Sequence, residues 1–135
     1  MPYDCELREA YATLLHSEPW DIYMTTTYRI PRHDGIRAAG RLWDILSNKF
    51  EAERAFVAVE AHRLDGIHLH ALSHHATRPN LAPSSVWKYL FKANGRTTVE
   101  RPRYSSTALV SWYCSKYVVK GNCDFHFFGD PCAWG

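Results

Sequence analysis

The sequence predicts a single α+β domain in which one antiparallel-dominated sheet carries helices mainly on one face. The chain has 135 residues, of which 46% are hydrophobic and 22% charged, and this balance is typical of one soluble globular domain. Two runs of alternating apolar residues, 55–62 and 67–74, flank an Asp-Gly pair that indicates a β-hairpin. Segments with helical periodicity precede and follow this hairpin, so we expect helical crossovers between strands.

The chain begins with a predicted helix followed by a strand. Residues 3–20 read as a helix that is capped by Asp4 and ends before Pro19. Residues 20–30, WDIYMTTTYRI, are rich in β-branched and aromatic side chains and end at Pro31, so they predict a strand.

A longer helix is predicted over residues 33–55, with Asp34 as its cap. Apolar residues recur through its length at helical spacing, and these are expected to face the core. The expected stripe consists of Ile36, Ala39, Gly40, Trp43, Leu46 and Phe50.

After the hairpin, two helices alternate with extended segments. Residues 84–95 and 107–121 are each predicted as a helix that ends at glycine. Residues 96–104 read as a strand or an extended loop, and residues 123–128 as a short strand. Because the helices are expected on one face of the sheet, the other face is left for a substrate.

The composition excludes some classes of protein but does not by itself indicate a function. The net charge is only +2, so any basic surface must come from local clustering. No apolar run approaches the ~20 residues that span a membrane, and no signal peptide is recognised, so we expect a cytoplasmic protein without a membrane partner. From this length we expect one domain and no second catalytic domain.

The four cysteines lack CxxC spacing and are expected to be reduced thiols. They are Cys5, Cys114, Cys123 and Cys132. The alternative is a zinc site formed by Cys123, His126 and Cys132, although their spacing matches no common zinc finger.

Four of the eight histidines lie in the short stretch HLHALSHH. Because side chains alternate along a strand, His68 and His70 share one face, and their Cα atoms are about 6–7 Å apart. Two imidazoles at this spacing can converge on one cation, although an isolated HxH pair on a strand is more often two surface histidines. His74 and His75 are expected to be surface or DNA-proximal residues.

A third ligand depends on the register of the hairpin. With a two-residue Asp-Gly turn, Glu60 would lie on the wrong face, whereas a three-residue turn over 64–66 places Glu60 opposite His70 and His62 opposite His68. In that turn Gly66 takes the left-handed position. A metal site therefore requires an odd-numbered loop, with His62 as the reserve ligand.

Glu60, His68 and His70 would suit Mn²⁺ or Mg²⁺ better than a closed zinc site, because two imidazoles and one carboxylate leave coordination positions open. Such an ion acts as a Lewis acid on a phosphoryl oxygen.

The stretch SWYCSKYVVKG holds two tyrosine–lysine pairs one helical turn apart. Tyr113 and Tyr117 share a helix face, with Lys116 and Lys120 in a row beside them. Two aromatic residues at this spacing are more often packing residues. However, a nearby lysine favours the phenolate, of which only ~0.1% exists near neutrality at a normal pKa of about 10. Two such phenols would permit two successive phosphoryl transfers.

Three motifs together resemble the HUH endonucleases, and most closely their two-tyrosine rolling-circle replication initiators from single-stranded DNA phages and plasmids. These motifs are YMTTTY, VEAHRLDGIHLHAL and YCSKYVVK, within about residues 20–129. The resemblance implies an RRM-like palm fold. It further implies that Glu60, His68 and His70 bind a divalent metal ion, Tyr113 and Tyr117 are nucleophiles, and Lys120 is the motif lysine, with Lys116 in the equivalent slot beside Tyr113.

The implied activity is metal-dependent nicking and joining of origin DNA, single-stranded or in a hairpin, through a 5′-phosphotyrosyl intermediate. A host helicase and polymerase would then be partners in the host cytosol. Substrate contacts are expected from basic and aromatic residues, namely Arg29, Arg96, Arg101, Arg103 and Tyr104. The alternatives are a two-tyrosine transposase and a non-catalytic RRM-like nucleic-acid-binding module.

Overall fold

The computed structural model describes residues 13, 19–62, 66–94, 96–101 and 123–129. Within them the chain forms a five-stranded antiparallel sheet with two α-helices, so the predicted α+β class is confirmed. The predicted helices at 3–20 and 107–121 lie outside the described residues, apart from Thr13, Pro19 and Trp20.

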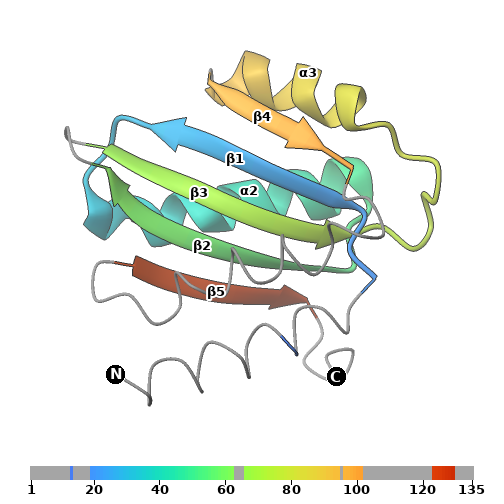
Figure 1. Ribbon diagram of the computed structural model, residues 1–135, viewed down its shortest axis with the longest axis horizontal. Coiled ribbons are helices and arrows are strands. Elements are labelled where there is room, and N and C mark those ends of the chain that lie inside the picture. Colours follow the sequence, from blue (N-terminus) through green and yellow to red (C-terminus); the bar gives the residue numbers. More distant parts are fainter. Residues whose placement is uncertain (1–12, 14–18, 63–65, 95, 102–122, 130–135) are drawn as a thin grey trace.

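The sheet has the strand order β4-β1-β3-β2-β5 (Figure 1). Its strands are β1 (Ile22–Tyr28), β2 (Arg54–His62), β3 (Gly66–His74), β4 (Thr97–Glu100) and β5 (Cys123–Gly129). Every pair of neighbours is antiparallel. The central strand is β3, which pairs with β2 along its whole length and with β1 at every residue between its two ends.

Two crossovers generate this order. A short 3₁₀ turn, η1 (Arg32–Asp34), and helix α2 (Gly35–Phe50) connect β1 to β2, and α3 (Pro83–Asn94) connects β3 to β4. The first six regular elements thus follow the β-α-β-β-α-β pattern of ferredoxin-like and RRM-like domains, to which β5 adds a fifth strand beside β2. Figure 1 shows α2 crossing behind the sheet and α3 beside β4.

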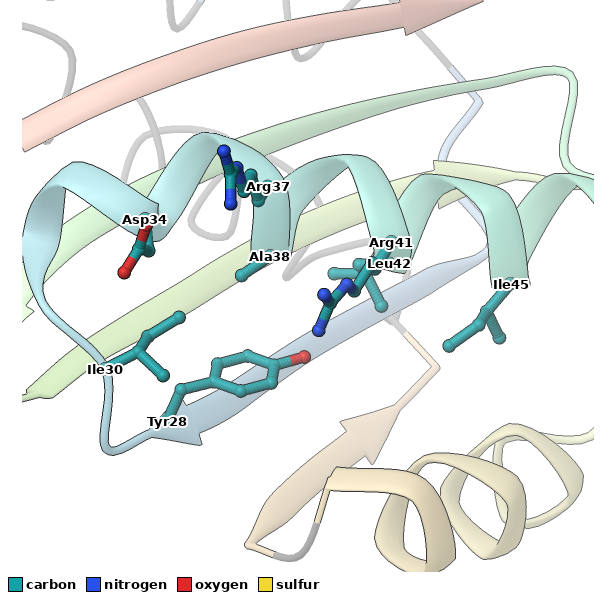
Figure 2. Close-up of a pocket in the computed structure, with 8 residues that line it drawn as sticks. All are labelled: Tyr28, Ile30, Asp34, Arg37, Ala38, Arg41, Leu42 and Ile45. Atoms are coloured by element: carbon teal, nitrogen blue, oxygen red, sulfur yellow. The ribbon is translucent and has the colours of Figure 1, made fainter.

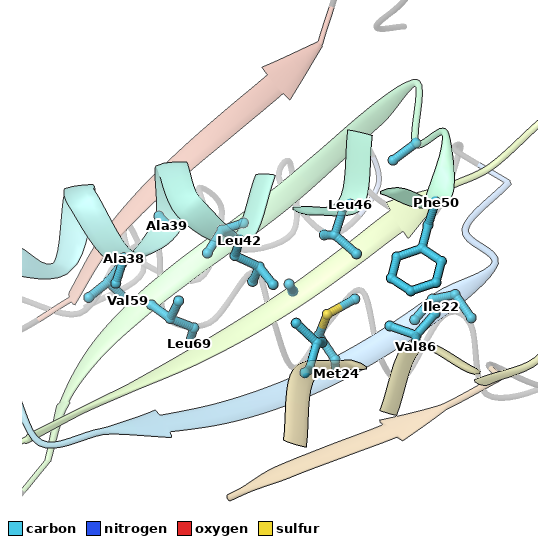
Figure 3. Close-up of a cluster of buried hydrophobic side chains, with 14 of the residues drawn as sticks. Ile22, Met24, Ala38, Ala39, Leu42, Leu46, Phe50, Val59, Leu69 and Val86 are labelled. Atoms are coloured by element: carbon cyan, nitrogen blue, oxygen red, sulfur yellow. The ribbon is translucent and has the colours of Figure 1, made fainter. Parts of the chain in front are cut away.

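The hydrophobic core fills the space between α2, α3 and one face of the sheet (Figure 3). Alternate residues of the strands supply the sheet side, and all are fully buried: Ile22, Met24, Val57, Val59, Ile67, Leu69 and Ala71. Helix α2 adds Leu42 and Leu46, and α3 adds Val86 and Leu90. Because side chains alternate, the neighbouring strand residues belong to the opposite face.

The rotation of α2 about its axis differs from the predicted stripe. Ala39, Leu46 and Phe50 are buried as expected, but Ile36 is 61% exposed and Trp43 is only partly buried. The cause is Gly35, where an added Cβ would lie 2.6 Å from Val59 Cγ1. This close approach of the helix start to β2 turns Ala38 and Leu42 toward the sheet.

The structure also differs from the predicted helix at both ends of α2. Asp34 occupies the N-cap position, but its side chain makes no capping hydrogen bond. The helix ends at Phe50 rather than near residue 55, because Glu51 adopts a left-handed conformation with φ 59°. The chain then enters β2 at Arg54.

The hairpin has the predicted odd-numbered loop, but a different set of turn residues. Glu60 pairs with His68 and His62 pairs with Gly66, so the three connecting residues are 63–65 rather than 64–66. Gly66 therefore belongs to β3 rather than to the turn. The register differs from the prediction by two residues, because Glu60 pairs with His68 instead of His70, and this leaves every side chain on its predicted face.

The face opposite the described helices is only partly open. Glu60, His68, Thr25 and Thr27 on this face are partly exposed. Phe56, Ala58, Leu72 and His70 on the same face are buried. The expectation that this face is free for a substrate is thus met only in part, at the partly exposed positions.

Candidate functional site

The three predicted metal ligands lie on one face of the two central strands. Glu60 on β2 is paired directly with His68 on β3, and His70 is two residues further along the same face. The Nε2 atom of His70 is 3.5 Å from Oε1 of Glu60, and their side chains are 6% and 18% exposed. The structure therefore brings a carboxylate and two imidazoles together near the middle of the sheet.

Two threonines of β1 hold the histidine rings from the other side. Thr25 is paired with His70 and Thr27 with His68, so each hydroxyl lies beside one imidazole. Thr25 Oγ1 is 3.3 Å from Nδ1 of His70, and Thr27 Oγ1 is 3.0 Å from Nδ1 of His68. A hydrogen bond at Nδ1 fixes the orientation of an imidazole ring, as outer-shell partners do in known metal sites.

The rings are close to a shared coordination geometry without having reached it. The ring centroids of His68 and His70 are 6.1 Å apart, with the planes at 49°. Two imidazoles on one ion, with metal–nitrogen bonds of ~2.1 Å, have centroids about 5 Å apart. Accordingly, no group of three or more His, Cys, Asp or Glu side chains among the described residues is arranged so that it could hold a metal ion. Metal binding by Glu60, His68 and His70 therefore stays a prediction.

The reserve ligand and the alternative zinc set are less favourably placed. His62 pairs with Gly66 at the end of the hairpin, two positions beyond Glu60. In β5, Cys123 pairs with Glu60 and His126 with Val57, so these two positions belong to opposite faces of the sheet. Cys132 lies outside the described residues.

His75 is a buried structural residue, so the expectation that it lies at the surface is wrong. Its Nδ1 donates a hydrogen bond to the carbonyl of Phe50 at 2.7 Å, and its Nε2 accepts one from the Ser73 hydroxyl at 2.8 Å. Burial lowers the pKa of His75, which holds the ring in its neutral form. Its neighbour His74 is mostly buried and pairs with Asp21 at 2.8 Å.

The predicted DNA-contacting arginines are divided between two ends of the sheet. Arg29 follows the end of β1, and the Arg96 carbonyl accepts a hydrogen bond from the Thr27 amide, so both lie near the His68 end. Both side chains are exposed. Arg101 lies beyond the other end of β4 and donates a hydrogen bond to the Leu81 carbonyl at 2.7 Å.

The predicted nucleophiles and several associated residues lie outside the described residues. These are Tyr113, Tyr117, Lys116, Lys120, Arg103 and Tyr104.

An exposed aromatic pair on α3 was missed in the sequence. Trp87 and Phe91 stack on each other at 5.0 Å and are 39% and 51% exposed, with Lys88 and Lys92 exposed beside them. The signal was present as aromatic and lysine residues interleaved at helical spacing. Stacked aromatic rings next to cations are a common contact surface for unpaired bases.

Comparison with known proteins shows a similar fold in one solved structure but does not assign the chain to a family. No family model and no curated protein matches the chain. Among solved structures, the hypothetical protein ORF119 from Sulfolobus islandicus rod-shaped virus 1 is similar, with a TM-score of 0.54 and 13% sequence identity. The match covers 80% of this chain and 90% of the viral protein. Neither α2 nor α3, the helices of the described part, is long and apolar enough to cross a membrane.

Proposed function

We propose that this chain is a metal-dependent endonuclease of the HUH type, which nicks and rejoins single-stranded DNA to initiate rolling-circle replication. The observation that carries the proposal is the placement of Glu60, His68 and His70 on one sheet face, with both Nδ1 atoms held by threonines. A surface pair of histidines would not need two such hydrogen bonds from a neighbouring strand.

In this proposal Glu60 and the Nε2 atoms of His68 and His70 hold a Mn²⁺ or Mg²⁺ ion. The bound ion would supply Lewis-acid polarisation of a phosphoryl oxygen. The ordered imidazoles keep the donor set in place, because Thr25 and Thr27 restrict rotation of each ring.

Tyr113 and Tyr117 supply the nucleophilic oxygen. The phenol loses its proton, with Lys116 and Lys120 favouring the phenolate. Its oxygen forms a bond to phosphorus as the bond from phosphorus to the 3′ oxygen breaks. The departing 3′ oxygen takes up a proton from solvent, which also receives the proton lost by the phenol. The product is DNA joined to the protein through its 5′ phosphate and a free 3′-OH, which a polymerase can extend.

The test uses the full chain with Mn²⁺ and pooled single-stranded oligonucleotides, analysed by denaturing electrophoresis. We expect a covalent adduct on the 5′ phosphate that disappears with EDTA and in Glu60→Ala, His68→Ala and His70→Ala. His33→Gln is the matched control, because the His33 side chain is 79% exposed and lies on η1. Adducts on the 3′ phosphate, or adducts that form equally without metal, would refute the proposal.

A non-catalytic nucleic-acid-binding module is the second candidate, and the strand order favours it. The order β4-β1-β3-β2 is that of RRM-like domains, which bind single strands on the sheet face. In this case the protein binds oligonucleotides with equal affinity in Mn²⁺ and EDTA and never cleaves them. A two-tyrosine transposase would instead share the adduct chemistry and require element ends as its substrate.

A further inference from the structure

A pocket of about 250 Å³ lies between the end of β1 and the first half of α2, on the opposite side of the sheet from the histidines (Figure 2). Its apolar wall consists of Ile30, Ala38, Leu42 and Ile45. Its polar groups are Tyr28, Asp34, Arg37 and Arg41. The volume is just below the ~300–1,000 Å³ of pockets for drug-sized ligands, so a single nucleotide or smaller group is the right size.

The two arginines make this pocket suitable for an anion. Arg37 and Arg41 are four residues apart on α2, and both side chains are exposed. Among the described residues, no carboxylate forms an ion pair with either guanidinium, whereas Asp34 lies 3.6 Å from Nε2 of His33. Figure 2 shows the Arg41 guanidinium beside the Tyr28 hydroxyl, so Arg41 is the cation placed to meet an anion in this pocket, and Arg37 adds a second positive charge to its lining.

Tyr28 adds a neutral hydrogen-bond donor. Figure 2 shows its hydroxyl directed toward Arg41. Burial raises the pKa of Tyr28, although the Thr26 hydroxyl and, to a smaller extent, the Arg41 charge oppose this shift, so the phenol keeps its proton near neutrality. It can therefore donate a hydrogen bond to an anionic oxygen beside the guanidinium.

The position of the pocket links it to the histidine face. Thr27 and Tyr28 are adjacent in β1, and alternation directs Thr27 to His68 and Tyr28 to the pocket. The ladder between β1 and β4 covers only Tyr23–Thr26, so the edge of β1 at Tyr28 is not paired with β4. Exposed Arg29 and Arg96 lie at this same end. A single strand that leaves the histidine face can pass over this edge.

We infer that the pocket binds one nucleotide, with its phosphate at Arg41 beside the Tyr28 hydroxyl, Arg37 adding positive charge, and its base against the apolar wall. A nucleotide matches the arginines, the apolar wall and Asp34 of the pocket. It combines an anionic phosphate, a flat base that can pack on apolar side chains, and N–H groups that can donate hydrogen bonds to the Asp34 carboxylate. The inference rests on the proposed function for the choice of a nucleotide over other anions. The nucleotide comes either from the bound strand or from solution.

The experiment measures binding by the full chain in EDTA, so that metal-dependent cleavage cannot contribute. Calorimetry is used for the four deoxynucleoside monophosphates and for inorganic phosphate, and fluorescence anisotropy for a labelled oligothymidylate. The test variant is R37Q/R41Q, and K49Q is the control, because Lys49 lies on α2 outside the pocket. Y28F removes only the hydroxyl.

We expect R37Q/R41Q to weaken nucleotide binding by about tenfold or more, Y28F to weaken it less, and K49Q to have no effect. Binding of free monophosphates identifies a nucleotide from solution, and a defect seen only with the oligonucleotide identifies one from the strand. The inference is overturned if R37Q/R41Q binds like the wild type, or if inorganic phosphate binds as tightly as the nucleotides.

The same variants separate this inference from the proposed function. If R37Q/R41Q loses nucleotide binding while the wild type forms no adduct with DNA, the inference of a nucleotide pocket is supported and the proposed endonuclease activity is refuted. If adducts form in the wild type while R37Q/R41Q binds nucleotides and DNA normally, the proposed endonuclease activity is supported and the inference of a nucleotide pocket is refuted.

Discussion

At the scale of single residues, the hydroxyls of Thr25 and Thr27 decide how the two histidines are presented. Each threonine is the direct cross-strand neighbour of one histidine, and each hydroxyl lies within hydrogen-bonding distance of Nδ1. A valine has nearly the same shape as threonine but cannot make this bond. A threonine-to-valine change can thus separate the effect of ring orientation on metal affinity from the effect of side-chain packing on stability.

For Thr27→Val we expect Mn²⁺ affinity to fall by about 10–100-fold, as outer-shell substitutions typically do. Loss of one hydrogen bond should reduce the free energy of unfolding by only about 1 kcal/mol. Titration calorimetry measures the affinity. Thr98→Val is the control, since exposed Thr98 on β4 is paired with Thr25 rather than with a histidine. Equal Mn²⁺ affinity in both variants would show that the threonines do not orient the ligands.

Buried histidines make stability depend on pH in a defined direction. Burial lowers the pKa of His75, with Asp21 opposing the shift, and it also lowers the pKa of His126, with Asp124 opposing it. In the unfolded chain both rings take up a proton near pH 6.5, while the folded protein resists protonation to lower pH. The folded state is therefore fully stable above pH 6.5 and loses stability as pH falls from there toward the lowered pKa.

Urea unfolding at pH values above and below 6.5 measures this loss. His75→Gln removes one titrating ring and should flatten the pH dependence, whereas His33→Gln, which alters an exposed ring, should not. NMR titration of the wild-type imidazoles provides a second test that does not depend on the variant folding. A His75 pKa at or above 6.5 would contradict the prediction.

At the scale of elements, the contact between Gly35 and Val59 sets how α2 lies on the sheet. We expect Gly35→Ala to lower the free energy of unfolding by about 1–3 kcal/mol, because the new methyl group would overlap a fully buried valine. Gly40 on the same helix has nothing within 4 Å of an added Cβ, so Gly40→Ala should instead stabilise by about 0.5–1 kcal/mol. Thermal and urea unfolding compare the pair. Equal effects at the two positions would mean that the Gly35 contact does not position the helix.

The elements also show how far the sequence could predict the structure. Alternation correctly placed Glu60, His68 and His70 on a common face, because register parity depends only on the strands and an odd-numbered loop. The two-residue shift in register, which pairs His62 with Gly66, could not be read from the turn residues alone. The rotation of α2 depends on its close approach to β2, and the burial of His75 depends on Phe50, which is 25 residues away. The threonine contacts required knowledge that β1 pairs with β3 rather than with β2.

At the scale of the whole molecule, the proposed chemistry requires both the histidines on the sheet and the two tyrosines. Phenylalanine at either Tyr113 or Tyr117 should weaken a single nicking event without abolishing it, because the other phenol has similar neighbours in the sequence. The double change should abolish adducts but leave oligonucleotide binding nearly intact, since binding depends mainly on phosphate and base contacts elsewhere. Denaturing electrophoresis and anisotropy measure the two effects. One inactive single variant beside one fully active variant would show that only one tyrosine is a nucleophile.

The location of both histidines on β3 has a consequence for the motions of the protein. This strand is paired on both sides, with β1 and with β2, so its amides can exchange with solvent only when the sheet itself opens. We expect the amides of His68 and His70 to be among the slowest to exchange with deuterium. Local fluctuations would then leave the two histidines in place, and an ion bound there would stabilise the entire fold, so the melting temperature would rise with Mn²⁺ concentration.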